Sequence, residues 1–225
     1  MKNVLQKIAF IALSVVLTGM LSSRALAASN SSLTQTINPG TLTTDITDAS
    51  RVSIASPTLA MTTSNVGFTC STTTGTLGSN TSRLYISNAS NASGGWTLTA
   101  SATSGTTSLW TDQTYGTSYD FNDAASAGCS DGTDADTAGG QLRIDPSVGT
   151  ITTDCQSCTM TGISKGSSAA FAEGTTDSIT LINAGASSDD IWRGYLTGVG
   201  LTQSIPANTD WGHYSFGLTL TATAQ

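Results

Sequence analysis

The sequence is short of charge, and most of the charge that it has is negative. Charged residues make up 10% of the 225 residues, with eight Lys or Arg against fifteen Asp or Glu. Three of the eight basic residues, Lys2, Lys7 and Arg24, lie close to the N-terminus, so five remain against fifteen acidic residues in the rest of the chain. A chain with this net negative charge repels the phosphate backbones of nucleic acids. We therefore expect no binding of nucleic acid.

Residues that commonly act in catalysis are also scarce. His213 is the only histidine and Glu173 the only glutamate. Asp189 and Asp190 are adjacent, and adjacent residues of a strand point to opposite faces, so they are poor partners for acid–base chemistry. We expect that the protein is not an enzyme.

A long apolar run occurs only at the N-terminus. "IAFIALSVVLTGML" follows a start that carries Lys2 and Lys7, and it is too short to favour a membrane span. Ala25-Leu26-Ala27 has the small-x-small form that signal peptidase accepts. We predict a signal peptide at 1–27 and a secreted, extracellular, cell-surface associated chain at 28–225 without a membrane span. No cysteine follows the apolar run, which disfavours a lipid anchor.

The four cysteines all lie in the predicted exported part. An even number in an oxidising compartment indicates two disulfides, and four cysteines allow three pairings. The favoured pairing joins Cys155 to Cys158 and Cys70 to Cys129. A redox C-x-x-C needs a helix after the motif to lower the thiol pKa, and the flanks "TITTDCQSCTMTGI" do not favour one. A four-thiolate zinc site is disfavoured because only one close cysteine pair exists.

The composition predicts strands. Leu, Lys and Glu, the usual material of long helices, are few. Short runs with alternating apolar residues recur instead, each bounded by Gly, Asn, Ser or Asp. We predict an all-β, antiparallel β-sandwich over 28–225 as a single domain with a long acidic loop, although two domains are compatible with this length. The predicted strands are "LTQTI", "RVSIAS", "VGFTC", "RLYIS", "GWTLTAS", "QLRID", "SITLI" and "YSFGLTLTATA".

The last of these runs is the most regular. Apolar residues alternate with Ser, Gly and Thr over its whole length, the period of a half-buried strand. The predicted inward face consists of Tyr214, Phe216, Leu218, Leu220 and Ala222.

Two stretches, "GGWTLTAS" and the terminal "YSFGLTLTATAQ", resemble the WxL-domain family of exported bacterial surface proteins. The first Trp-x-Leu is present as Trp96-Thr97-Leu98, and Leu218-Thr219-Leu220 stands where the second is expected. The resemblance implies non-covalent binding to cell-wall peptidoglycan, with Trp96 and Leu98 as ligand-binding residues. The alternative is that Trp96 is a core residue whose indole N–H meets a neighbouring carbonyl.

Other aromatic residues lie in regions that read as strand ends or loops, where ligand-contacting residues often lie. They are candidates for stacking on sugar rings, or for core and edge packing alone. These residues are Trp110, Tyr115, Tyr119, Trp192 and Trp211.

The acidic stretch 120–142 is the strongest chemical signal. Two clusters, one of Asp120, Asn122 and Asp123 and the other of Asp131, Asp134 and Asp136, offer short oxygen ligands of the kind that Ca²⁺ prefers. The second cluster fits an EF-hand loop imperfectly, with Ala138 at a ligand position and Asp145 in place of the final Glu. We predict a sandwich loop that binds Ca²⁺, with a solvated acidic loop as the alternative.

Two functions follow from these patterns. The first is a non-catalytic surface protein that binds cell-wall peptidoglycan, another surface glycan or a surface protein, and that Ca²⁺ stabilises. The second is a self-assembling subunit of a surface layer or fibre, in which faces rich in Ser, Thr, Gly and Ala pack against further copies.

Overall fold

The computed structural model describes residues 34–91, 93–132 and 138–225. Contacts divide the chain into Met1–Asn38 and Pro39–Gln225. In the first unit, the described residues 34–38 form no strand or helix. The predicted signal peptide 1–27 lies outside the described residues. The second unit contains every described strand, so the fold is described for that unit alone.

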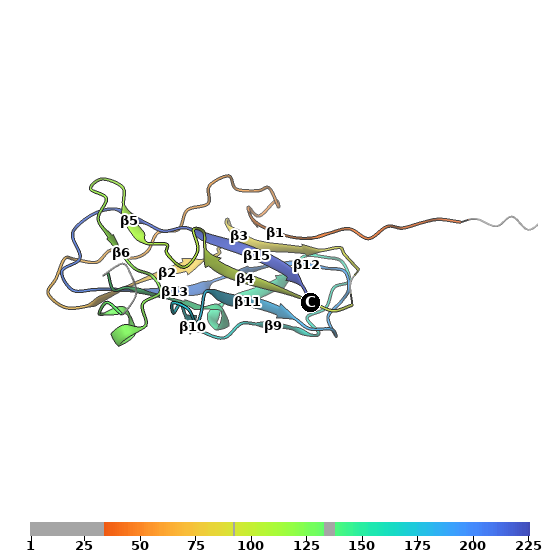
Figure 1. Cartoon of the computed structure of the whole chain (residues 1–225). Helices are drawn as coiled ribbons and strands as arrows, with labels where there is room; N and C mark the ends of the chain where they lie inside the picture. The colour runs from red at the N-terminus through yellow and green to blue at the C-terminus, as the bar shows by residue number, and fades with distance from the viewer. Residues whose placement is uncertain (1–33, 92, 133–137) are drawn as a thin grey trace, which may run out of the picture. The chain divides into compact units, whose positions relative to one another are not determined.

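The unit Pro39–Gln225 is built from antiparallel strands in three four-stranded sheets and one three-stranded sheet (Figure 1). Sheet A has the order β1-β3-β12-β8, and sheet B the order β10-β7-β13-β2. The strands of sheet A are β1 (Leu42–Thr47), β3 (Arg83–Asn88), β12 (Trp192–Thr197) and β8 (Thr150–Thr153). Those of sheet B are β10 (Ala169–Ala170), β7 (Gln141–Asp145), β13 (Val199–Ile205) and β2 (Ser71–Leu77).

Sheet C has the order β15-β4-β11-β9, and sheet D the order β14-β5-β6. The described helices are two short 3-10 turns, η1 (Ala125–Gly128) and η2 (Pro146–Val148). The strands of sheet C are β15 (Leu218–Ala224), β4 (Trp96–Ala102), β11 (Ser178–Ala184) and β9 (Ile163–Lys165). Those of sheet D are β14 (Tyr214–Ser215), β5 (Trp110–Asp112) and β6 (Ser118–Tyr119). The prediction of an all-β, antiparallel, sandwich-like fold is confirmed.

A corner joins sheets A and B. Short connections lead from β2 to β3, from β7 to β8 and from β12 to β13, so each pair of strands passes between the two sheets. Gly78 and Gly198 have φ of 80° and 75°, which favours glycine. Gly198 N donates to Gly78 O at 2.9 Å, and Gly149 lies against Thr197. Strands that switch sheets at such bends form the corners of orthogonal sandwiches.

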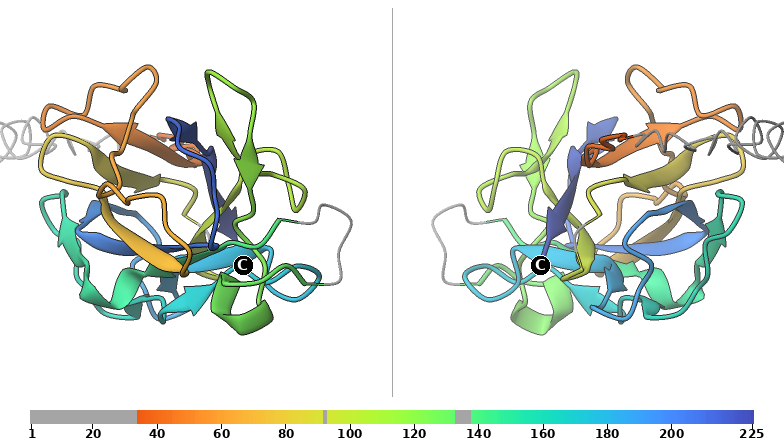
Figure 2. Two further views of the ribbon diagram at one scale, coloured as in Figure 1. Left: turned by 90° about the vertical axis from the view of Figure 1, so that its left-hand side faces the viewer. Right: turned by 90° about the vertical axis from the view of Figure 1, so that its right-hand side faces the viewer.

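The core lies between sheet C and sheets A and B. Trp96 of sheet C and Trp192 of sheet A are 1% and 0% exposed, and their ring centroids lie 5.3 Å apart. Figure 2 shows the strands of the unit end-on, arranged around this interior. A buried tryptophan removes on the order of 200 Å² from water, worth about 5 kcal/mol before entropy is counted. This contact is therefore a principal link between the layers.

The burial pattern follows the predicted alternation in β4, where Trp96, Leu98, Ala100 and Ala102 face inward. In β11 the register shifts between Thr180 and Ile182, so a bulge puts the consecutive residues Leu181 and Ile182 both in the core.

Three of the predicted strands either do not form or consist of a single bridge. "VGFTC" is a loop in which Val66 and Phe68 are 64% and 93% exposed, because alternation alone does not supply a pairing partner. "RVSIAS" keeps a single bridge at Ser53, and residues 34–37 of "LTQTI" form no strand.

The predicted terminal strand breaks between Ser215 and Leu218. β14 pairs with β5 in sheet D, whereas β15 pairs with β4 in sheet C. Phe216 packs against Trp110, and Gly217 O accepts a hydrogen bond from Thr103 N at 2.9 Å. The chain therefore changes sheets within a run whose apolar period is unbroken.

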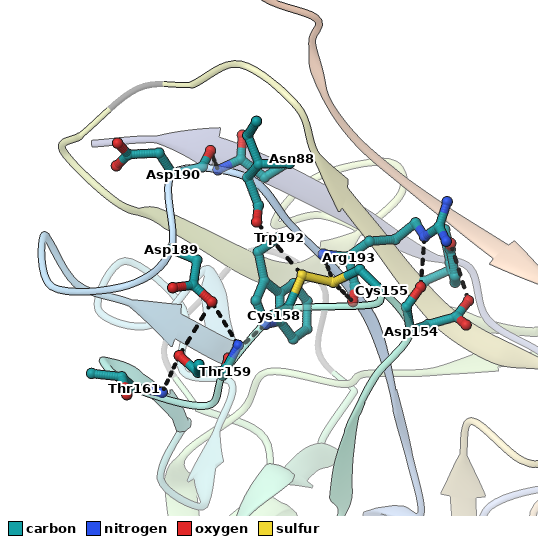
Figure 3. Close-up of a disulfide and its surroundings, with 12 residues drawn as sticks. Asn88, Asp154, Cys155, Cys158, Thr159, Thr161, Asp189, Asp190, Trp192 and Arg193 are labelled. Atoms are coloured by element: carbon teal, nitrogen blue, oxygen red, sulfur yellow. Dashed lines mark hydrogen bonds between the residues drawn. A yellow bond between two sulfur atoms is a disulfide. The ribbon is translucent and has the colours of Figure 1, made fainter.

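Both disulfides have the predicted pairing. Cys70 and Cys129 have Cα atoms 5.4 Å apart and join the start of β2 to the acidic loop. Cys155 and Cys158 have Cα atoms 5.6 Å apart and lie beside Trp192 (Figure 3). The chain leads from β8 through this loop to β9, and none of the described residues of the loop is helical. The C-x-x-C therefore has the surroundings of a structural disulfide rather than of a thioredoxin-like site.

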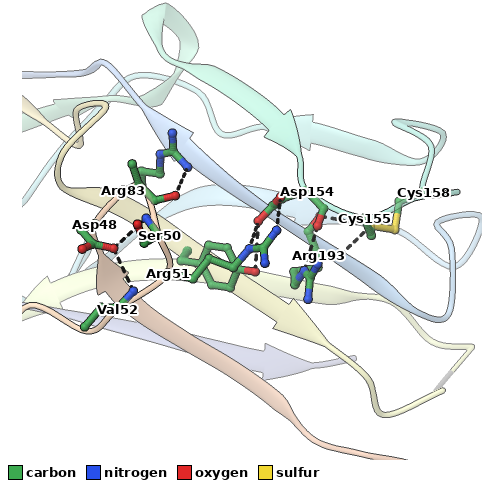
Figure 4. A network of polar contacts seen from close by, with 11 residues as sticks. Asp48, Ser50, Arg51, Val52, Arg83, Asp154, Cys155, Cys158 and Arg193 are labelled. Carbon is green, nitrogen blue, oxygen red and sulfur yellow. Dashed lines mark hydrogen bonds and ion pairs between the residues drawn. A yellow bond between two sulfur atoms is a disulfide. The ribbon is translucent and has the colours of Figure 1, made fainter.

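A polar network ties the loop after β1 to the end of β8 (Figure 4). Arg51 donates to both carboxylate oxygens of Asp154, with Nη2 to Oδ1 at 2.7 Å. Arg193 Nε donates to Asp154 O at 2.8 Å, and Tyr85 Oη donates to Asp154 Oδ2 at 3.3 Å. The hydrogen bond from Arg51 lowers the pKa of Asp154. Arg51 is half exposed, so the pair contributes little net stability.

Removing the two disulfides should have different effects on stability. Cys70 and Cys129 are 59 residues apart, so replacing both with serine should lower the free energy of unfolding by about 4 kcal/mol. Cys155 and Cys158 are 3 residues apart, and the same change there should cost about 2 kcal/mol. Urea denaturation of the two double variants measures both values. An equal loss in the two variants would contradict the difference in loop length as its cause.

Candidate functional site

The Trp-x-Leu motif does not form an exposed site. Trp96 is 1% exposed and Leu98 is fully buried, because both face inward from β4. The prediction that these residues contact a ligand therefore finds no accessible surface. No described residue accepts a hydrogen bond from Trp96 Nε1, whereas Trp192 Nε1 donates to Thr159 O at 3.0 Å. The expected carbonyl partner of the Trp96 indole is thus absent among the described residues.

Sheet D lies at one end of the unit (Figure 1). Residues of sheet D and of the neighbouring connections line a pocket of about 580 Å³. Its size is typical of ligand pockets. Four parts of the chain build it: the connection between β1 and β2, the start of β2, sheet D, and the segment from β13 to β14. We call it the aromatic pocket, after the four aromatic side chains that line it, which are Trp110, Tyr119, Trp211 and Tyr214.

The inner wall of the aromatic pocket is rigidly packed. Trp110 stacks on Tyr119 with centroids 5.9 Å apart and an interplanar angle of 11°. Trp110 Nε1 donates to Gln203 Oε1 at 2.9 Å, and the buried Gln203 donates in turn to Asp120 O at 3.2 Å. Burial raises the pKa of Tyr119, whose ring lies 4.9 Å from that of Tyr214. This wall is therefore an uncharged aromatic surface held in one orientation.

The outer wall presents exposed aromatic rings. Trp211 is 67% exposed and meets the edge of Tyr115, which is 60% exposed, at a centroid distance of 5.0 Å. Large aromatic rings whose only role is packing are seldom left this exposed to water. Trp211 is the aromatic residue of the pocket that is best placed to contact a ligand.

A buried carboxylate holds these two loops together. Asp112 is 2% exposed at the end of β5. Its Oδ2 accepts hydrogen bonds from Thr114 N at 3.0 Å and Tyr115 N at 2.5 Å, and its Oδ1 accepts one from His213 N at 2.6 Å. A Cβ at Gly212 would lie 2.5 Å from Asp112 Oδ1, so glycine permits the close approach. Asp112 thereby joins the turn after β5 to the segment before β14.

These hydrogen bonds also set the charge of the group. The N–H of Tyr115, followed by those of His213 and Thr114, lowers the pKa of Asp112, while burial opposes the change. A carboxyl group whose folded pKa is depressed stabilises the fold above its unfolded pKa of about 3.9. That contribution is lost as the pH falls through the folded value, so acid should loosen the outer wall.

Polar groups in the pocket suit hydroxyl-bearing ligands. Asp210 is exposed, and no described residue donates a hydrogen bond to its carboxylate. Its main-chain oxygen accepts a hydrogen bond from Tyr214 Oη at 2.9 Å. The Trp211 ring follows directly in the chain. A flat apolar ring beside a free carboxylate can stack on the C–H face of a sugar and accept hydrogen bonds from its hydroxyls.

The structure brings some of the predicted aromatic residues together and separates others. Trp110, Tyr119 and Trp211 line the pocket, and Tyr115 contacts Trp211 at its rim. Trp192 is a core residue at the other end of the strands. Tyr214 was predicted to face the core and in fact lines the pocket.

The side chains of the first acidic cluster are buried and help to hold the acidic loop in place. Asp120, Asn122 and Asp123 are 1%, 2% and 4% exposed. Asp123 Oδ2 accepts a hydrogen bond from Gly132 N at 3.0 Å, and Asn122 Nδ2 donates to the main chain of Thr106 at 3.0 Å. These bonds fasten the acidic loop, which the Cys70–Cys129 disulfide also anchors.

The second acidic cluster is only partly described. Asp131 is exposed, and Asp134 and Asp136 lie outside the described residues. Within residues 34–91, 93–132 and 138–225, no group of three or more His, Cys, Asp or Glu could hold a metal ion. Asp145, placed last in the EF-hand alignment, ends β7 and accepts from Ser147 N at 3.0 Å. The Ca²⁺ loop stays a prediction.

Two serines occur in the spelling G-x-S-x-G, at Gly128–Gly132 and Gly162–Gly166. In α/β-hydrolases this serine lies on a sharp turn between a strand and a helix. Ser164 lies instead within β9, and Ser130 follows the disulfide-bonded Cys129 in the acidic loop. Neither serine lies on the strand-to-helix turn that this motif forms in α/β-hydrolases.

No protein-family model, curated protein or solved structure matches the chain. None of the helices among the described residues has the length and hydropathy needed to cross a membrane.

Replacing Asp112 with asparagine should loosen the outer wall of the aromatic pocket. An asparagine keeps one acceptor oxygen and turns an NH₂ group toward the N–H donors, so the amides of Tyr115 and His213 should exchange with solvent faster. Hydrogen exchange followed by NMR measures this directly. Asp145→Asn, which alters a hydrogen bond to Ser147 outside the pocket, is the matched control. Unchanged protection in Asp112→Asn would show that the carboxylate does not hold the loops.

Proposed function

We propose that the protein is an exported, non-catalytic cell-surface protein that binds a cell-wall or surface glycan in the aromatic pocket. The observation that carries this proposal is the set of Trp110, Tyr119, Trp211 and Tyr214 around one cavity of about 580 Å³. Aromatic rings bury large areas at low entropic cost, and sugar rings offer matching C–H faces.

The remaining lining residues support a polar, hydroxyl-rich ligand. Threonine and serine side chains from the connection before β2 and from β2 itself face the cavity, and each hydroxyl can both donate and accept. The hydroxyls of Thr62, Ser64 and Ser71 already hydrogen-bond within the chain, and each keeps further donor or acceptor capacity for a ligand. The side chains are those of Thr62, Thr63, Ser64, Thr69, Ser71 and Thr73.

The resemblance to WxL domains makes peptidoglycan the first glycan to test. The residues that carry the resemblance, Trp96 and Leu98, are buried, so we assign the binding role to the opposite end of the strands. β4 spans seven residues, about 20 Å at the usual rise, between Trp96 and the end that leads to sheet D. The two disulfides and the predicted signal peptide support an extracellular location.

A second candidate function is self-assembly, which the outer face of sheet C favours. Each outward position on β15, β4 and β11 that the pairing aligns carries a hydroxyl or amide, without charge or large apolar groups. Such a face could pack against a copy of itself. The aligned residues are Thr219, Ser101 and Ser178; Thr221, Thr99 and Thr180; and Thr223, Thr97 and Asn183.

Loss of the Trp211 ring should weaken glycan binding strongly without unfolding the protein. Because Trp211 is 67% exposed, Trp211→Ala should change stability by less than about 0.5 kcal/mol. Its binding to purified sacculi should fall at least about tenfold, since an aromatic anchor is worth more than 1.4 kcal/mol. Co-sedimentation of the folded, signal-free chain measures the binding.

The matched control is Ile191→Ala, because Ile191 is 60% exposed beside the buried Trp192 and away from the pocket. Binding by Trp211→Ala at the wild-type level, or failure of the wild type to bind sacculi and other wall or surface glycans, would rule out the pocket as a glycan site.

Self-assembly makes a separate prediction. Light scattering of the wild type should show particles that grow with concentration, and Thr221→Lys should reduce this, because it places a charge on the exposed face that would be buried between copies. A wild type that stays monomeric at high concentration would exclude the second candidate.

A further inference from the structure

The aromatic pocket carries negative charge without positive charge beside it, in keeping with a chain that has few basic residues. Its lining residues include one carboxylate, Asp210, and one histidine, His213, but no lysine or arginine. The carboxylate of Asp112 lies directly behind the outer wall, where it accepts a hydrogen bond from His213 N. Two carboxylates therefore act on the cavity without a permanent cation beside them.

The basic residues of the described chain lie away from the aromatic pocket. Arg51 and Arg193 bind Asp154 on sheet A, and Arg83 lies 4.2 Å from the centre of the Tyr195 ring. Lys165 donates to the main-chain oxygens of Ser147 and Gly149. Arg143 faces outward from β7. None of the five lines the pocket.

We propose that the aromatic pocket selects uncharged glycans and rejects polyanionic ones, and that Asp210 sets this selectivity. The inference rests on the proposed glycan-binding function. A neutral sugar stacks on Trp211 and donates hydroxyl hydrogens to the Asp210 carboxylate, which has no described donor of its own. A phosphate or uronate group at the same place has no hydrogen to donate and is repelled by the carboxylate.

The proposal therefore divides possible glycan ligands into uncharged polymers, which should bind, and anionic polymers, which should not. Uncharged polymers of hexoses or N-acetylhexosamines satisfy both the rings and the carboxylate. Polymers with a phosphodiester or a uronic acid in each repeat bind most readily where lysine or arginine offsets their charge. The pocket offers no such side chain.

Calorimetric titration with two hexasaccharides tests the proposal. One is the uncharged hexamer of N-acetylglucosamine and the other the anionic hexamer of galacturonic acid. The wild type should bind the uncharged hexamer at least about tenfold more tightly at about 0.1 M salt, where the Debye length is about 10 Å. Asp210→Lys should reverse or abolish this preference, because the carboxylate becomes an ammonium group.

A control variant separates the local effect from the net charge. Asp190→Lys makes the same change of charge at an exposed position near Trp192, away from the pocket. It should keep the wild-type preference. Equal binding of both hexamers by the wild type, or equal effects of Asp210→Lys and Asp190→Lys, would overturn the selectivity while leaving glycan binding intact. Binding of neither hexamer, nor of sacculi, would overturn the proposed function and the selectivity together.

Discussion

The contact between Trp96 and Trp192 is the interaction on which the other features depend. It joins sheet C to sheet A in the core, and the buried tryptophan of the Trp-x-Leu motif is one of its two rings. Strands that start from this contact run to the opposite end of the unit, where their connections are free to differ in length and composition. The aromatic pocket lies among those connections. This division between a fixed core and variable loops is common in β-sandwiches, whose ligand sites are often on loops.

The pocket loops are long, yet covalent and charged contacts restrain them. The Cys70–Cys129 disulfide anchors the start of β2 to the acidic loop, next to the backbone that Gln203 binds. Asp112 joins the turn after β5 to the segment that carries Trp211. Holding exposed rings in place before a ligand arrives reduces the entropy lost on binding. These restraints favour a site that binds its ligand without large movement.

Much of the fold could be predicted from the sequence, because β4 and β7 alternate apolar and polar residues as half-buried strands do, and β3 and β11 are short apolar runs with partial alternation. The number and spacing of the cysteines favoured the observed disulfide pairing among the three that four cysteines allow. β2 was missed because its sequence, STTTGTL, buries Thr73 and Leu77 without an apolar period. The pocket was only partly predictable: its aromatic residues were candidates, but their assembly depends on the pairing of β14 with β5, about a hundred residues apart in the chain. Local patterns carry no information on such pairing.

The four tryptophan indole N–H groups give the most direct test of the central claim, that the motif tryptophan is structural and the aromatic pocket binds the ligand. In an NMR titration of the labelled protein with the uncharged hexamer of N-acetylglucosamine, the indole signals of Trp211 and Trp110 should shift. Those of the buried Trp96 and Trp192 should stay in place. A shift of the Trp96 signal with Trp211 unchanged would contradict the account, because the ligand would then act at the Trp-x-Leu motif.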